Sequence, residues 1–347
     1  MDGYKNTRAI YHLRDLKIEE LTHDLFTLRV AVVGIPCLDI NGVGRWHGYS
    51  RELESVPRFL ATEDTVRPGG PGNLAHCFAT LGSTVYMVGT IGTPDMYSKE
   101  LLLQLGGHGI RTEYLTEYGI TPIFGKYYWP SGHLVSRVDR ASSPLDSDTV
   151  NKVALDLRTA SKIVDLIVFA DYDECGHPLC QEVSTILPMS EISDGDRVKT
   201  VATSRTNIMS FRTLGYTVSD EEELGEQLDI NIIRDGAWDI YRTIGGNSIN
   251  IITLGGIGSS AYHKDGVLPS MVNPIEEEVD TCGCGDAFLA LFSGAIATNH
   301  SLPTALALGN MAGRATARKL YGADAPTLGD IEREIVKYRA EHPGELE

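Results

Sequence analysis

Basic residues are scarce in this sequence: 30 Lys and Arg stand against 47 Asp and Glu among 347 residues, for a formal net charge of −17. Binding of a polyanionic nucleic acid requires a cationic footprint, so we expect no nucleic acid partner. The sequence also lacks an apolar run of membrane-spanning length and a signal peptide, and its six cysteines have no regular spacing. We therefore expect no membrane partner, reduced thiols and a cytoplasmic location, with a small molecule, phosphorylated or not, as the partner.

The composition, with 42% hydrophobic and 22% charged residues, suits one large α/β domain. Residues 28–35 are almost continuously apolar, as buried parallel strands are. From residue 147 onward, segments typical of helices and strands alternate. Helices are expected at 147–162, 228–243, 302–321 and 328–338, and strands at 166–170, 198–203 and 249–254. This alternation predicts a doubly wound, mostly parallel sheet flanked by helices.

The chain divides into residues 1–27, an N-terminal extension, and residues 28–347, the main domain. The extension contains a charged, helix-like stretch at 13–21, and its role cannot be read from the sequence. Residues 122–128 and 133–138 alternate around the turn Pro130–Gly132 and predict a hairpin. Together with residues 38–50, this region (121–139) is expected to form a small sheet that projects as a lid. The alternative is an ordinary edge hairpin.

The most informative motif is the segment Asp280–Phe288, DTCGCGDAF, which precedes the apolar run 287–297. A glycine turn at the start of a helix directs backbone N–H groups into one space, where the helix dipole favours an anion. Asp286 would lie beside this anion site, in the position of a general base for phosphoryl transfer. The candidate catalytic residues are Gly283, Cys284, Gly285 and Asp286. Alternatively, the glycines only allow a strand to enter a helix tightly.

A second glycine cluster, Arg67–Asn73 (RPGGPGN), precedes apolar residues at helical spacing between Leu74 and Leu81. Gly82 is expected to end this helix. Glycines such as Gly69 and Gly70 let the backbone approach a small polar ligand closely. Asn73 can hydrogen-bond the hydroxyl groups of such a ligand, or it can simply cap the helix.

These two motifs, in this order, resemble the N-terminal and C-terminal signatures of the ribokinase-like (phosphofructokinase B) carbohydrate kinases, the latter usually written DTxGAGD. Residues 249–261 resemble the strand and glycine turn on the nucleotide side of that family, and residues 305–319 resemble the helix that closes over adenine. The resemblance covers about residues 30–338. It implies a ribokinase-like fold and the ATP- and Mg²⁺-dependent phosphorylation of a sugar hydroxyl.

The resemblance also assigns roles to residues. The sugar would lie under the lid, which excludes water, and the family often dimerises through this lid, so we expect a homodimer. Substrate-binding candidates are Asp39, Gly69, Gly70, Asn73, Arg137 and Asp171. Nucleotide-binding candidates are Thr253, Gly255, Gly258, Asn310 and Gly313. The γ-phosphate would face the N–H groups of residues 282–285, with Asp286 as the base.

Within the family, residues 32–39, 67–70, 137–139 and 170–172 look like the bacterial heptose-7-phosphate kinases of ADP-heptose synthesis. Two departures stand out. The motif N-x-x-E, which organises magnesium in many members, aligns with Ser219–Glu222, so Glu222 would act on the metal indirectly and the asparagine is missing. The lysine that follows Asp171–Tyr172 in the heptose kinases is also missing, and Arg137, Arg140 or Arg205 would have to compensate.

Several alternatives stay open. A nucleoside kinase of the same fold and a non-catalytic member that binds sugar or nucleotide both fit the motifs. The pattern GxGxxA at 256–261 also suits a dinucleotide site, but it should open a helix, and here it leads into a strand-like segment. The pair Cys282 and Cys284 lacks the second pair or nearby histidines of a zinc site. The sequence identifies neither the sugar nor the hydroxyl group.

Overall fold

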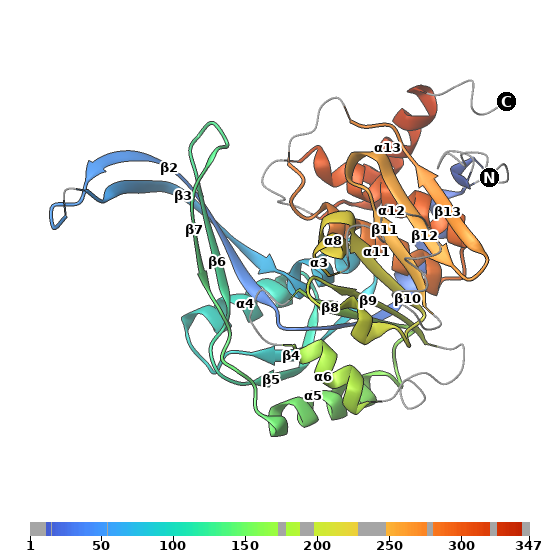
Figure 1. Ribbon diagram of the computed structural model, residues 1–347, viewed down its shortest axis with the longest axis horizontal. Coiled ribbons are helices and arrows are strands. Elements are labelled where there is room, and N and C mark those ends of the chain that lie inside the picture. Colours follow the sequence, from blue (N-terminus) through green and yellow to red (C-terminus); the bar gives the residue numbers. More distant parts are fainter. Residues whose placement is uncertain are drawn as a thin grey trace.

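A computed structural model describes residues 12–14, 16–53, 55–172, 178–187, 198–227, 248–275, 280–319 and 325–341 (Figure 1). The helix expected at 228–243 lies outside these residues. A nine-stranded sheet has the order β13 (Gly266–Met271), β12 (Gly258–His263), β11 (Ile249–Thr253), β10 (Tyr216–Asp220), β9 (Lys199–Ser204), β8 (Leu166–Asp171), β1 (Arg29–Val33), β4 (Thr84–Ile91), β5 (Arg111–Glu117). Neighbours from β11 to β5 are parallel, and the pairings β11–β12 and β12–β13 are antiparallel. The expected fold class, a mostly parallel α/β sheet, is confirmed.

Side chains that alternate along the central strands divide most of the interior into two large hydrophobic cores; a third, small cluster contains Ile208, Leu224 and Ile252. In β1, Val30 and Val32 enter one core, while Ala31 and Val33 enter the other. The first core packs under α2 (Ile18–Thr27), α3 (Pro71–Thr80), α4 (Met96–Gly107), α11 (Cys284–Ala297), α12 (Leu302–Ala317) and α13 (Leu328–Glu341). The second packs under α5 (Ser147–Ala160) and α6 (Leu179–Ile186). This is the doubly wound arrangement that near-continuous apolar strands require.

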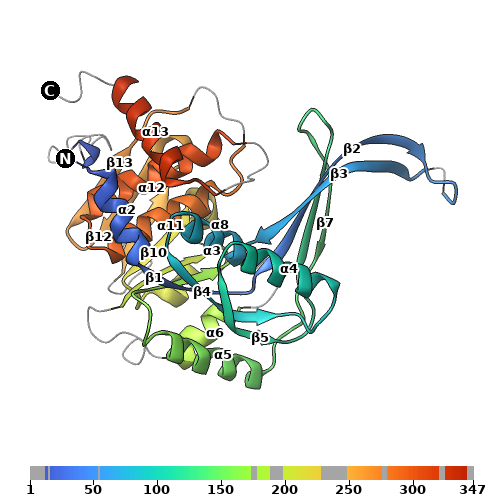
Figure 2. The ribbon, with the colours of Figure 1, turned by 180° about the vertical axis from the view of Figure 1, so that it is seen from behind.

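The described part of the N-terminal segment before residue 28 packs on the body of the protein (Figure 2). Helix α2 begins at Ile18, later than the helix-like stretch at 13–21 suggests, and it packs on α11 and α13. Leu21 and Leu25 of α2 are fully buried in the first core. Burial of one leucine side chain stabilises a fold by roughly 1.5–3 kcal/mol, so α2 adds to the stability of this core. No helix among the described residues has the length and apolar character needed to cross a membrane.

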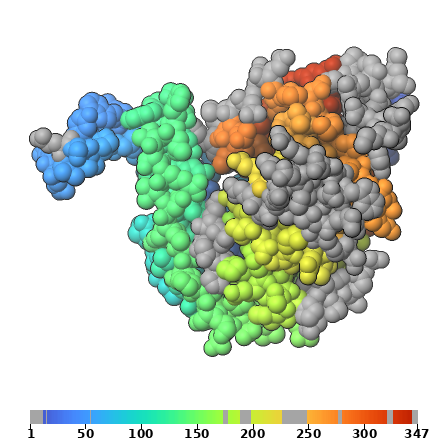
Figure 3. All heavy atoms as spheres, in the orientation of Figure 1, coloured from blue at the N-terminus to red at the C-terminus, as the bar shows by residue number. Residues whose placement is uncertain are grey.

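A second, four-stranded sheet forms the expected lid. Its order is β3 (Pro57–Gly69), β2 (Cys37–Tyr49), β6 (Ile123–Tyr128), β7 (Leu134–Arg140). In Figure 3 the green strands β6 and β7 stand beside the body, and the blue hairpin β2–β3 projects beyond them. The sequence did not predict β3, because most of this strand is exposed and polar and lacks the apolar alternation of a half-buried strand.

Candidate functional site

The turn before α11 has the geometry that the glycines predict. Gly283 precedes the helix with a left-handed backbone (φ = 80°), a conformation that glycine adopts without strain. One expectation is corrected, because two of the four amides are used within the turn. The N–H of Cys282 donates to Asp280 Oδ1 (2.9 Å) and that of Cys284 donates to the carbonyl oxygen of Thr281 (3.2 Å). An anion at this helix start would therefore be bound by the amides of Gly283 and Gly285.

Asp286, in the first turn of α11, joins the two sequence motifs directly. Asn73 Nδ2 donates to one carboxylate oxygen of Asp286, and the Tyr172 hydroxyl donates to the other. Asn73 does not cap α3, since the residue at that position is Gly70 and no side chain caps this helix. Burial raises the pKa of Asp286, while the hydrogen bonds from Tyr172 and Asn73 oppose the shift. The expected proximity of the two glycine segments is thus observed.

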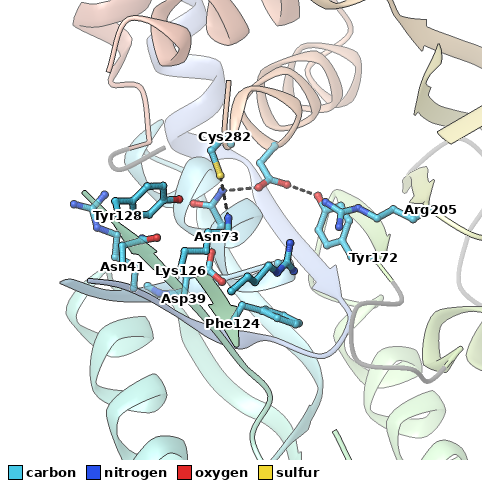
Figure 4. A pocket seen from close by; sticks show the side chains of 15 residues that line it. Asp39, Asn41, Asn73, Phe124, Lys126, Tyr128, Tyr172, Arg205 and Cys282 are labelled. Carbon is cyan, nitrogen blue, oxygen red and sulfur yellow. Dashed lines mark hydrogen bonds between the residues drawn. The ribbon is translucent and has the colours of Figure 1, made fainter. Parts of the chain in front are cut away.

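A cavity of about 110 Å³, here called the lid-side cavity, lies between the lid and this carboxylate (Figure 4). Most of its lining residues are polar, and four of them are cationic. They are Asp39, Asn41, Arg67, Pro68, Gly70, Asn73, Phe124, Lys126, Tyr128, Arg137, Tyr172, Arg205, Cys282, Gly283 and Asp286. The cavity therefore suits a polar ligand with hydroxyl groups and negative charge.

The pairing of the lid strands places the lid residues that line this cavity next to one another. Asp39 of β2 lies opposite Arg67 of β3 and beside Phe124 of β6. Two residues further along β6, on the same face, Lys126 lies opposite Arg137 of β7. The sequence analysis did not select Phe124, Lys126 or Tyr128; the alternation of these side chains along β6 was the available signal.

The position of the Asp39 carboxylate depends on the nearby Gly69. A Cβ atom at Gly69 would lie 2.3 Å from Asp39 Oδ1, so only glycine leaves this carboxylate in place. Burial raises the pKa of Asp39; the positive charges of Lys126 and Arg137 oppose the shift, and the Asp286 charge adds to it. Gly69 therefore leaves room for a carboxylate that lines the cavity and does not itself line it.

Another substrate candidate, Asp171, lies outside the lid-side cavity. It is buried at the end of β8, where its Oδ2 atom accepts hydrogen bonds from Gln181 Nε2 (2.8 Å) and Ser204 Oγ (2.8 Å). The next residue, Tyr172, reaches the cavity and Asp286 instead. The sequence pattern located the correct strand end, but successive side chains at such an end point in different directions.

A second cavity, of about 310 Å³, lies on the other side of the α11 turn and is called the helix-side cavity. It contains all five nucleotide-binding candidates: Thr253, Gly255, Gly258, Asn310 and Gly313. The side chains of Phe288, Val272 and Ala317 form an apolar part of the cavity wall. The Asn310 amide donates to the carbonyl oxygen (2.8 Å) and the hydroxyl (3.1 Å) of Ser270, so it fixes β13 against α12. The GxGxxA segment enters strand β12 rather than a helix, which removes the structural context of a dinucleotide site.

A connecting region of the same cleft lies between the two cavities and shares residues with both. With the lid-side cavity it shares Tyr172, Arg205, Cys282, Gly283 and Asp286, and with the helix-side cavity it shares Asp220, Thr253, Thr281 and Gly285. Asp286 therefore lies on one continuous path between a polar compartment and a glycine-rich, apolar compartment.

The magnesium candidate Glu222 does not line this path; it is exposed in α8 (Glu221–Gln227), and its neighbour Glu223 lines the connecting region. Asp220 and Glu223 exchange hydrogen bonds, since each backbone N–H meets the carboxylate of the other residue (3.3 and 2.6 Å). Burial, and then the charge of Asp220, raise the pKa of Glu223. The two residues that meet in the structure, Asp220 and Glu223, thus lie one position later in the chain than the aligned pair Ser219 and Glu222.

These two carboxylates suit a hard divalent cation. Mg²⁺ in proteins is commonly held by one or two carboxylates together with water and substrate phosphates. In the part of the chain that the structure describes, this site included, no cluster of three or more His, Cys, Asp or Glu side chains could hold a metal ion. The donor set is therefore compatible with a magnesium ion that arrives with a phosphorylated ligand.

Comparison with known proteins identifies relatives. Residues 234–328 match the model of the pfkB family carbohydrate kinases. The bifunctional protein HldE of Hydrogenovibrio crunogenus is 23% identical over 326 residues, and that of Pseudomonas paraeruginosa is 26% identical over 333 residues. These alignments cover 90% and 91% of this chain but only 64% and 65% of the relatives' length.

Solved structures share the fold. Phosphofructokinase-2 from Escherichia coli, in its tetrameric inhibited form, superposes with a TM-score of 0.71 at 16% identity, covering 90% of this chain and 99% of that chain. Ribokinase from Arabidopsis thaliana, complexed with ribose and ATP, gives a TM-score of 0.65 at 17% identity, with coverages of 89% and 99%. The resemblance that the two glycine motifs indicate is thereby confirmed, as is the expected ribokinase-like fold.

Proposed function

Because the chain carries a pfkB family carbohydrate kinase region on a ribokinase-like fold, we propose that it transfers the γ-phosphoryl group of ATP to a hydroxyl group of a sugar. The observation that carries this proposal is the position of Asp286. Its carboxylate lies where the lid-side cavity meets the path to the helix-side cavity. A base at this junction can contact an acceptor hydroxyl on one side while a phosphoryl donor approaches from the other.

In this reaction, Asp286 accepts the proton of the acceptor hydroxyl. The new bond forms between that oxygen and the γ-phosphorus, the bond to the bridging oxygen breaks, and ADP leaves. Asn73 and Tyr172 hold the two carboxylate oxygens of Asp286, so the base is oriented before the substrate binds. The amides of Gly283 and Gly285 and the α11 dipole stabilise charge on the transferred group.

ATP would occupy the helix-side cavity and the connecting region. Phe288, Val272 and Ala317 offer an apolar wall for the base, and Gly255 and Gly258 allow close approach of the ribose. Asp220 and Glu223 would hold magnesium against the phosphates. When bound, the ion neutralises the charge that develops on the phosphate oxygens.

The acceptor we propose is a sugar that already carries phosphate, with a heptose phosphate as the first candidate. Arg67, Arg137 and Arg205 all line the lid-side cavity. Arginine side chains bind phosphate through several parallel hydrogen bonds. Arg137 and Arg205 therefore supply positive charge in place of the lysine that follows Asp171–Tyr172 in the heptose kinases and is missing here. Arg140 does not line the cavity; its guanidinium donates to the carbonyl oxygen of Thr121 (2.7 and 3.1 Å).

The test is an ADP-release assay with purified protein, ATP and Mg²⁺ across a panel of sugars, sugar phosphates and nucleosides. We expect turnover with a sugar phosphate, above all a heptose phosphate, and little with the corresponding free sugar. Turnover with nucleosides alone would instead identify the protein as a nucleoside kinase of the same fold. Binding of nucleotide without turnover on any member of the panel would contradict the proposed catalysis.

We also propose that a second copy of the chain binds to the lid. Large apolar side chains are exposed on the lid strands: Trp46, Leu60, Leu134 and Val138, at 57%, 38%, 54% and 62% of their accessible area. Exposed apolar side chains on a projecting element are typical of an interaction surface. Sedimentation velocity at several concentrations measures the oligomeric state, and a monomer throughout would contradict the homodimer. An ATP-dependent reaction also fits the expected cytoplasmic location.

A further inference from the structure

The lid contributes one cation that reaches the α11 turn. Lys126, in the middle of β6, extends from the lid to Cys282, and its Nζ lies 3.5 Å from the Cys282 sulfur (Figure 4). Cys282 directly precedes Gly283, whose amide belongs to the proposed anion site. Lys126 therefore connects the lid to the reaction centre, at the side where the transferred group would lie.

The surroundings of Lys126 keep it charged without giving it an ion pair. Burial alone would lower the pKa of Lys126, but Cys282, Asp39 and Tyr128 raise it. Within the described ranges, no carboxylate lies within 4 Å of its ammonium group, whereas Arg137 is paired with Asp139 (2.7 Å) and Arg205 with Glu223 (3.4 Å). Of these three cations, Lys126 is thus the one without a carboxylate partner within 4 Å among the described residues.

The contact with Cys282 is weak enough to be exchanged. Burial raises the pKa of the Cys282 thiol, although Lys126 opposes this shift, so the thiol is neutral at neutral pH. A neutral thiol is a poor acceptor compared with a phosphate oxygen. In addition, Lys126 lies directly opposite Arg137 in the antiparallel pair β6–β7, and like charges in that position destabilise a sheet. An anion between the lid and the turn would relieve this repulsion.

We infer that Lys126 binds the γ-phosphoryl group during its transfer and so makes the lid part of the catalytic machinery. This inference rests on the proposed kinase function. Lys126 keeps its proton throughout and acts through charge, while Asp286 takes the proton of the acceptor. Closure of the lid over the acceptor would thus bring positive charge to the phosphoryl group at the same time as it excludes water.

The experiment compares the affinities of two nucleotides by calorimetry in the presence of Mg²⁺: β,γ-imido-ATP, which has the third phosphate, and ADP, which lacks it. We expect Lys126→Met to weaken binding of β,γ-imido-ATP about tenfold to a hundredfold and to leave ADP binding within about twofold. Lys126→Arg should restore part of the loss, because the charge is kept. Lys126→Gln serves as a second neutral variant if Lys126→Met does not fold.

Two controls separate the phosphoryl contact from a structural role. Arg45→Met removes a cation from exposed lid strand β2 and should change neither affinity. Lys99→Met removes an exposed lysine of α4 by the same substitution and should keep the native preference between the two nucleotides. Equal losses for ADP and β,γ-imido-ATP in Lys126→Met, or no loss for either, would overturn the inference while leaving the kinase proposal standing. Failure of the native protein to bind either nucleotide would overturn both.

Discussion

The two cavities that meet at Asp286 are built in different ways. Glycines and apolar side chains make up much of the helix-side cavity, together with polar residues such as Asp220, Asn310 and Arg314, and many of them come from the consecutive helices α11 and α12. The lid-side cavity collects charged and polar side chains from segments that are far apart in the chain: residues 39–41, 67–73, 124–128, 137, 172, 205 and 282–286. The first suits a ligand shared by many enzymes, and the second suits a ligand particular to this one.

This difference indicates where specificity is decided. Backbone shape sets the helix-side cavity, and many sequences can supply that shape. The lid-side cavity depends on which side chains the lid strands place opposite one another, as Asp39 opposite Arg67 and Lys126 opposite Arg137 illustrate. Substitutions in the lid should therefore change the acceptor, while substitutions at the α11 turn should change the reaction with any acceptor.

The largest effect is expected where the two cavities meet. Asp286→Asn removes the proton acceptor but keeps a side chain of the same size, so turnover should fall about 10²- to 10⁴-fold while affinity for β,γ-imido-ATP stays nearly unchanged. Steady-state kinetics and calorimetry measure the two quantities. Asp265→Asn, in the exposed turn between β12 and β13, is the control. Turnover close to the native value would exclude Asp286 as the base.

The next effect concerns the lid-side cavity alone. In Gly69→Ala, the added methyl group would displace the Asp39 carboxylate, and loss of that contact should raise the KM for the acceptor about tenfold or more. The KM for ATP should not change. Gly106→Ala, where the added methyl group meets open space, is the matched control. An equal rise in both KM values would mean that Gly69 supports the whole cleft, not only its acceptor side.

The corresponding substitution on the nucleotide side is at Gly285. Gly285 lies in the first turn of α11, and a Cβ atom there would meet no protein atom within 4 Å, because it would project into the cleft. Gly285→Ala should stabilise the helix by up to about 1 kcal/mol and at the same time raise the KM for ATP several-fold. Thermal unfolding and kinetics test the two effects separately. A more stable protein with native ATP kinetics would place the phosphates elsewhere.

The contrast between the cavities also explains what the sequence could predict. The helix-side residues lie in short motifs with glycine turns, and all five candidates reach that cavity. On the lid side, Asp39, Gly70, Asn73 and Arg137 line the cavity, whereas Lys126 and Tyr128 were missed and Asp171 was selected in place of Tyr172. These errors concern strand register and the direction of single side chains, which depend on pairing with strands remote in sequence. In the same way, Glu222 is exposed, whereas the next residue, Glu223, lines the connecting region.

The smallest effect, and the most specific one, concerns the acid limb of the pH–rate profile. Asp286 acts as a base only when ionised, so activity should be lost as the pH falls through its pKa. Burial raises that pKa, and the hydrogen bond from Tyr172 lowers it. Tyr172→Phe removes this hydrogen bond, so the pKa should rise further and the acid limb of kcat/KM should move to higher pH. Tyr216→Phe, whose ring packs against Phe292 in the core, is the control and should leave the limb in place. A limb that stays fixed or moves to lower pH in Tyr172→Phe would show that another group controls the ionisation, and the path between the two cavities would then need a different base.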